Sequence, residues 1–273
     1  MDISNFGKGA LVQPIKLRDY RLELAAGFPL PPKFSLAELI SKIKNQNGSG
    51  SCVGQAFAYY AEVLNFIETG EYVELSARDI YSLIFQEPMG AYLKDGASKI
   101  CNSGVVLEKD AISYDNGKPP SEEFMRIRSD VLEDEETQGN IFASKKYLTW
   151  DNQNVEMFKQ AIYQGNGAVV SCHGNNYLWA NAEIELPDAS SQLTWSHAVY
   201  LVGYDDAKKH FLFVNSWGEE WGSGGFGYLP YAYVKYMANP FTLIDLPNEH
   251  FVQLLSVYFN LLQKVVNLLK VKK

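Results

Sequence analysis

The sequence predicts an α+β fold with two lobes and a cleft between them. Apolar residues at helical spacing dominate the first half of the 273 residues, whereas the second half holds short β-type runs broken by Gly, Asn and Asp. With 47% hydrophobic and 21% charged residues, the chain has an ordinary globular composition and is long enough for two lobes. Its formal charge of −8 argues against a nucleic-acid partner, which normally meets a basic face.

The pattern divides the chain into four parts: an N-terminal arm over residues 1–27, a mainly helical lobe over 28–120, a mainly β lobe over 121–247 and an amphipathic helix over 248–273. In the helical lobe, Ser51 is the expected N-cap of a helix from Cys52 to Thr69 that ends at Gly70. Further helices are expected from Ser76 to about Gln86, within 90–120, from Ser121 to about Leu132, and from Asn152 to Gly165. The expected strands cover 168–170, 198–202, 210–214 and 226–233.

Three separate patches supply a thiol, an imidazole and two amides. Cys52 lies at the first turn of its expected helix, where unsatisfied N–H groups and the helix dipole favour a thiolate. His197 is suited to accept the thiol proton and return it to a leaving amine, and Asn215 to fix the orientation of its ring. Gln46, with the N–H of Cys52, is the candidate holder of an oxyanion. Trp217 is expected to cover the His197–Asn215 bond.

These patches resemble the motifs of the papain-like cysteine peptidases. Gln46 precedes Cys52 by six residues, Cys52 and His197 are 145 apart, and His197 and Asn215 are 18 apart. The run after Asn215, Ser-Trp-Gly-Glu-Glu-Trp-Gly-Ser-Gly-Gly, matches the asparagine motif of that family almost letter for letter. The resemblance covers about residues 30–240. It implies a helical lobe beside an antiparallel β-barrel-like lobe. It also implies hydrolysis of protein or peptide substrates by a Cys-His-Asn triad, with Gly90 and Trp217 lining the substrate cleft. The resemblance implies neither a cofactor nor a metal.

The departures from the family pattern refine the expectation. Ser49 stands where the family usually has a second, disulfide-bonded Cys, and Val53 stands where it has an aromatic residue. Three widely spaced cysteines do not make a disulfide framework, which favours a reducing compartment. We find neither a signal peptide nor an apolar run of 18 residues, so we expect the protein in the cytoplasm. The missing disulfide also favours a member closer to the bacterial and phage types of the family. The extension ahead of Gln46 is too short for the usual inhibitory prosegment.

Residues 250–273 lie outside the resemblance. Leu254, Leu261 and Leu268 repeat every seven residues, as do the leucines one position later, and lysines gather at the end of the segment. This pattern predicts a helix with a wide apolar face. Three uses are open: self-association or a partner helix, docking on the protein's own body, or contact with a membrane surface.

Two alternatives to hydrolysis also remain open at this point. An acyltransferase or ligase would use the same triad, because hydrolysis and transfer differ only in what reaches the thioester. A catalytically silent scaffold would instead bind partners through residues 250–273. Cys101 and Cys172 are expected to be structural, since cysteine is often a small core residue, and the adjacent Cys172 and His173 have no second pair at metal-ligand spacing.

Overall fold

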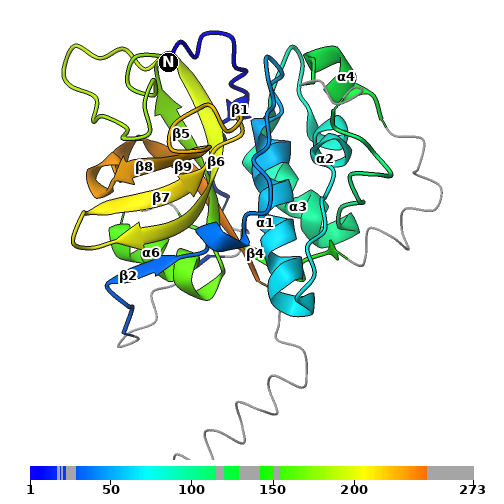
Figure 1. Ribbon diagram of the computed structural model, residues 1–273, viewed down its shortest axis with the longest axis horizontal. Helices are drawn as coiled ribbons and strands as arrows, with labels where there is room; N and C mark the ends of the chain where they lie inside the picture. The colour runs from blue at the N-terminus through cyan, green and yellow to red at the C-terminus, as the bar shows by residue number, and fades with distance from the viewer. Residues whose placement is uncertain are drawn as a thin grey trace, which may run out of the picture.

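The computed structural model describes residues 1–16, 19, 21–22, 29–114, 120–128, 142–150 and 154–244 of the chain. Within these residues, helices gather on one side and a mostly antiparallel sheet on the other, which confirms the α+β class (Figure 1). The helical side holds α1 (Cys52–Thr69), α2 (Ala77–Ile84), α3 (Leu93–Ser103) and α4 (Glu122–Arg126). Helix α6 (Val155–Gln164) packs against the sheet. Short 3-10 turns cover Ala37–Leu39 and Tyr231–Tyr236.

The sheet has seven strands, and its main path runs β4-β9-β5-β6-β7-β8, with β2 paired to β6. All of its pairs are antiparallel. The strands are β2 (Lys33–Ser35), β4 (Lys146–Thr149), β5 (Ala168–Gly174), β6 (Trp195–Asp205), β7 (His210–Val214), β8 (Phe226–Pro230) and β9 (Met237–Ile244). A separate parallel pair joins β1 (Ala10–Leu11) to β3 (Ala91–Tyr92).

Helix α1 is buried along its first fourteen residues, which include the polar Gln55, Glu62 and Asn65. It begins at Cys52 and ends at Thr69, and Gly70 takes the left-handed conformation (φ 75°) that commonly closes a helix. Both bounds agree with the sequence expectation. Ser51 is the N-cap residue, as expected, but its side chain makes no capping hydrogen bond and its Oγ instead lies 2.7 Å from Ser49 Oγ.

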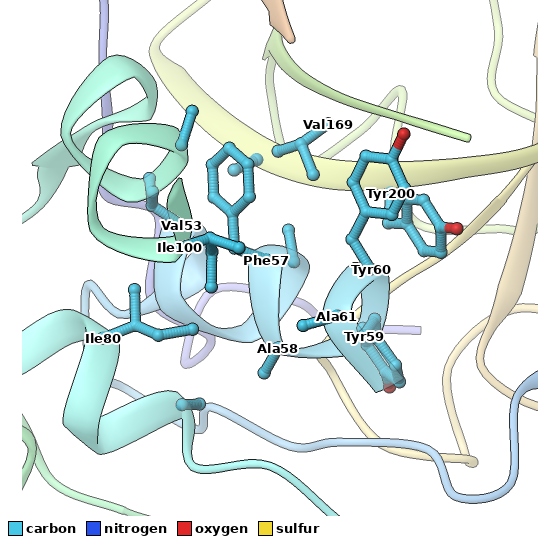
Figure 2. Close-up of a cluster of buried hydrophobic side chains, with 14 of the residues drawn as sticks. Val53, Phe57, Ala58, Tyr59, Tyr60, Ala61, Ile80, Ile100, Val169 and Tyr200 are labelled. Carbon is cyan, nitrogen blue, oxygen red and sulfur yellow. The ribbon is translucent and has the colours of Figure 1, made fainter. Parts of the chain in front are cut away.

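Strand β6 joins the two cores of the molecule because successive side chains point to opposite faces of a strand. Ala198, Tyr200 and Val202 belong to the cluster shared with α1, whereas Val199 and Leu201 belong to the cluster behind the sheet. Figure 2 shows Phe57 and Tyr60 of α1 meeting Val169 and Tyr200 of the sheet. The Tyr60 and Tyr200 rings stack with centroids 4.8 Å apart. The helix that carries Cys52 is thereby fixed against the strand that carries His197.

The strand expected over 226–233 ends at Pro230, where a 3-10 turn begins, and β4 and β9 were not expected at all. The amphipathic helix expected over 248–273 lies outside the described residues. Among the residues that the structure describes, no helix combines the length and apolar character needed to span a membrane.

Candidate active site

Cys52 opens α1 and its side chain is wholly buried. The Cys52 thiol donates to Gly50 O at 3.9 Å, and nearby backbone N–H groups, those of Ala198, Gly9, Val53 and Cys52 itself, act to lower its pKa. These donors favour a thiolate, but removal from water opposes it more strongly, and burial raises the pKa of the thiol to about 11. The thiolate expected from the helix terminus is therefore not the form favoured in this structure, because the sulfur is enclosed.

His197 lies near the start of β6 and is also fully buried. Its Nε2 is 2.8 Å from Asn215 Oδ1, and the Trp217 ring stacks on the imidazole with centroids 4.5 Å apart. Burial lowers the pKa of His197 to about 3; the Asn215 bond acts against this shift, whereas the positive charge of Lys8 adds to it. Cys52 and His197 are thus both neutral in this state.

Asn215 follows β7 and is held by bonds at its side chain and its backbone. Its Oδ1 also accepts the N–H of Ser216 at 2.8 Å, which directs the carbonyl end of the amide toward the imidazole. Its backbone oxygen accepts the Tyr59 hydroxyl at 3.2 Å, and that hydroxyl in turn accepts the N–H of Lys44. Because Tyr59 lies on α1, seven residues after Cys52, one side chain joins the helix to the segments that carry Asn215 and Gln46.

Gln46 is held so that its amide nitrogen faces the N-terminal arm. Its Oε1 accepts the Ser216 hydroxyl, and its Nε2 donates to Ser49 O at 2.8 Å and to Gly7 O at 3.0 Å. Ser49 closes this turn, since its hydroxyl donates to Gln46 O at 2.7 Å. The residue that replaces the family's second cysteine therefore stabilises the loop before Cys52 by hydrogen bonds.

The two expected substrate-binding residues also lie beside the arm. Gly90 has φ +103°, and a Cβ placed there would come within 2.4 Å of Gly9 O, so only glycine allows this approach. Trp217 is 1% exposed and covers His197, as expected, while its other neighbours include Phe6, at 5.6 Å between ring centroids. All six site residues named from the sequence thus lie around one place where the helices meet the sheet.

Sequence reasoning missed three contributors to this site. Ser216 follows Asn215 directly and was read as part of a motif without a role of its own. Tyr59 is two helical turns from Cys52, so the spacing of seven placed it on the same face as the thiol. The Gly7-Lys8-Gly9 segment lies in the arm, where no hydrophobic periodicity indicated contact with the site.

A buried thiol at a helix start and a buried imidazole bonded to an amide are the groups that a cysteine-dependent acyl transfer requires. The chain belongs to the papain family of cysteine proteases, whose family model matches residues 30–236. It is 26% identical over 244 residues to the uncharacterized peptidase C1-like protein L477 of Acanthamoeba polyphaga mimivirus, covering 80% of this chain and 74% of that protein. A cysteine protease of Blomia tropicalis is 26% identical, over 70% of this chain and 57% of its own length.

Solved structures agree on the fold. Xylellain, a cysteine protease from Xylella fastidiosa, superposes with a TM-score of 0.74 at 23% identity, covering 89% of this chain and 97% of its own. The chain spans between 50% and 74% of the length of the first four curated relatives it matches. Family model and fold together place this chain among the papain-type cysteine proteases.

Proposed function

We propose that the protein is an endopeptidase in which Cys52 is the nucleophile, His197 the general acid and base, and Asn215 the residue that orients the imidazole. The sulfur forms a bond to the carbonyl carbon of the substrate, and its proton passes to His197. Gln46 Nε2 and the Cys52 N–H stabilise the oxyanion. The C–N bond then breaks as His197 protonates the amine. Water next attacks the thioester, which releases the acid and restores the thiol.

The observation that carries this proposal is the difference in hydrogen bonding between the two ring nitrogens of His197. Asn215 Oδ1 occupies the Nε2 side, whereas the buried Nδ1 has no hydrogen-bond partner among the described residues. Nδ1 is therefore the nitrogen left to take the thiol proton. The N–H of Ala198, the residue after His197, acts to lower the pKa of the Cys52 thiol, and this supports a shared pocket for thiol and imidazole.

The test is hydrolysis of a mixture of fluorogenic peptides by the wild type and two matched variants. Cys52→Ala should reduce the rate to background, while Cys101→Ala, the same change at a partly buried cysteine, should leave it near the wild-type value. Adding an amine nucleophile and weighing the products separates hydrolysis from acyl transfer. Unchanged hydrolysis by Cys52→Ala would remove Cys52 as the nucleophile.

Three finer expectations stay part of this proposal. The relation to bacterial members is supported by the Xylella fastidiosa structure, although the matched relatives also come from mites, plants and a virus. The odd count of cysteines supports a reducing compartment such as the cytoplasm. Residues 250–273 remain the candidate surface for self-association or for a partner or membrane contact, and they lie outside the described residues.

A further inference from the structure

Glu122 accepts three hydrogen bonds beside the candidate active site. It is the first residue of α4, a short helix that packs beside α2 (Figure 1). Its Oε2 accepts the N–H of Gly50 at 2.6 Å. Its Oε1 accepts the Tyr81 hydroxyl and Arg126 Nε, each at 2.8 Å. One carboxylate therefore joins α4 to α2 and to the loop that precedes Cys52.

The hydrogen bonds of Glu122 lead to two glycines of the site. Gly50 lies two residues before Cys52, and the thiol donates to its carbonyl oxygen at 3.9 Å. Gly90, which we expect to line the substrate cleft, donates its N–H to the Tyr81 hydroxyl oxygen at 2.9 Å. Because that hydroxyl in turn donates to Glu122, the carboxylate holds the Gly50 N–H directly and the Gly90 N–H through Tyr81.

Gly50 and Gly90 also lie close to each other. A Cβ added at Gly50 would be 2.9 Å from Gly90 N and 3.0 Å from the Tyr81 hydroxyl oxygen, so glycine is required for this approach. With no side chain at either position, packing cannot fix the two segments, and their hydrogen bonds must do so. Tyr81 is fully buried, which makes the loss of either of its bonds costly.

Arg126 adds a second hold on the Gly90 segment. It lies four residues after Glu122 on α4 and pairs with that carboxylate. Its Nη2 donates to the carbonyl oxygen of Pro88, two residues before Gly90. We call Glu122, Arg126 and Tyr81 the clamp, because their polar groups bind both the loop before the nucleophile and the segment before β3.

No covalent bond supports this loop. Ser49 stands where the family usually has a disulfide-bonded cysteine, and all three cysteines of the chain are free. Hydrogen bonds to an ionised group are roughly twice as strong as bonds between neutral groups. The carboxylate of Glu122 thus supplies a non-covalent cross-link next to the position where a disulfide is missing.

We propose that Glu122 is a positioning residue of the peptidase, which through the clamp sets the place of the Cys52 loop relative to Gly90 and so the fit of the substrate. This inference rests on the proposed function. Glu122 acts through Gly50 and Tyr81 and does not itself meet the reacting groups. Its effect is on geometry, and misplacing a reacting group by roughly 1 Å can cost about 100-fold in rate.

The kinetic test compares full-length variants on the peptide mixture. Glu122→Ala removes every bond of the carboxylate and should lower kcat/KM by roughly 10- to 100-fold. Tyr81→Phe removes only the link to Gly90, so KM should rise by roughly 3- to 10-fold while kcat stays within about twofold. Glu122→Gln keeps one acceptor oxygen and should recover part of the loss. Glu123→Ala, at the exposed next residue of the same turn, is the matched control and should equal the wild type.

Amide hydrogen exchange at Gly50 and Gly90, followed by NMR, tests the clamp without an assay of activity. Exchange should be faster by roughly 3- to 10-fold at both glycines in Glu122→Ala and at Gly90 alone in Tyr81→Phe. Glu123→Ala should change neither rate.

Unchanged exchange at both glycines in Glu122→Ala, with native circular dichroism, would overturn the inference. Faster exchange with unchanged kcat and KM would also overturn it, because the clamp would then be structural only. A wild type that hydrolyses no peptide would count against the proposed function, and the exchange rates would still decide whether Glu122 holds the two glycines.

Discussion

Replacing Tyr59 by Phe removes one oxygen atom from the contact between α1 and the two segments that carry Asn215 and Gln46. Tyr59 is 1% exposed, and its hydroxyl accepts the Lys44 N–H and donates to the Asn215 carbonyl at 3.2 Å. Without it, a buried N–H and a buried C=O each lose a partner. An unsatisfied buried polar group costs about 1–3 kcal/mol, so for two such groups we expect the free energy of unfolding to fall by about 2–6 kcal/mol.

The assay is urea unfolding followed by circular dichroism, with the peptide mixture as a second readout. Tyr72→Phe is the matched control, because that hydroxyl also donates to a backbone carbonyl, Glu38 O at 3.2 Å, but the residue is 50% exposed. It should change stability by less than about 0.5 kcal/mol. The urea m-value should stay constant, since the folded structure remains. A Tyr59→Phe protein within about 0.5 kcal/mol of the wild type would refute the bridging role of this hydroxyl.

Three further predictions concern the site and its support. Asn215→Ala should lower kcat by about 10- to 100-fold, because a lost orienting group costs general acid–base catalysis much of its effect; an unchanged kcat would exclude orientation by Asn215. Burial lowers the pKa of His197 to about 3, so as the pH falls the unfolded chain binds a proton at this residue before the folded chain does. The free energy of unfolding of the wild type should therefore fall by about 2 kcal/mol between pH 7 and pH 5, as measured by urea midpoints, and His197→Gln should lack this loss. Glu62→Gln leaves the buried Lys44 ammonium, now 2.7 Å from Glu62, without its counter-charge; we expect a loss of about 3–5 kcal/mol, and a stable variant would show that the pair is dispensable.

The elements that the sequence predicted well are those whose signals are local. Helix α1 has an apolar run and a terminal Gly70, and both of its ends were placed correctly. Strand β7 is a continuous apolar run and was also placed correctly. Strand β9 was missed because Asn239 and Pro240 interrupt its sequence, although Phe241 and Leu243 lie in the core.

The state of the site depends on contacts between distant parts of the chain, and these carry no local pattern. The thiolate expected of Cys52 follows from its own helix, whereas its burial, which raises the pKa of the thiol, depends on how distant parts of the chain pack around the sulfur. The N-terminal arm is held beside the site by backbone groups of Asn47 and Ala91 and by the absence of side chains at Gly7, Gly9 and Gly90. Such backbone contacts leave no hydrophobic periodicity, and the resemblance to a family supplied the site residues but not these contacts.

The measurement that tests the central claim most directly is intact-mass analysis after treatment with an epoxide probe for papain-type thiolates, applied to the wild type and Cys52→Ala at neutral pH. The account predicts a single adduct on the wild type and none on Cys52→Ala. An adduct that persists in Cys52→Ala, or its absence from the folded wild type, would contradict the assignment of Cys52 as the nucleophile of this enzyme.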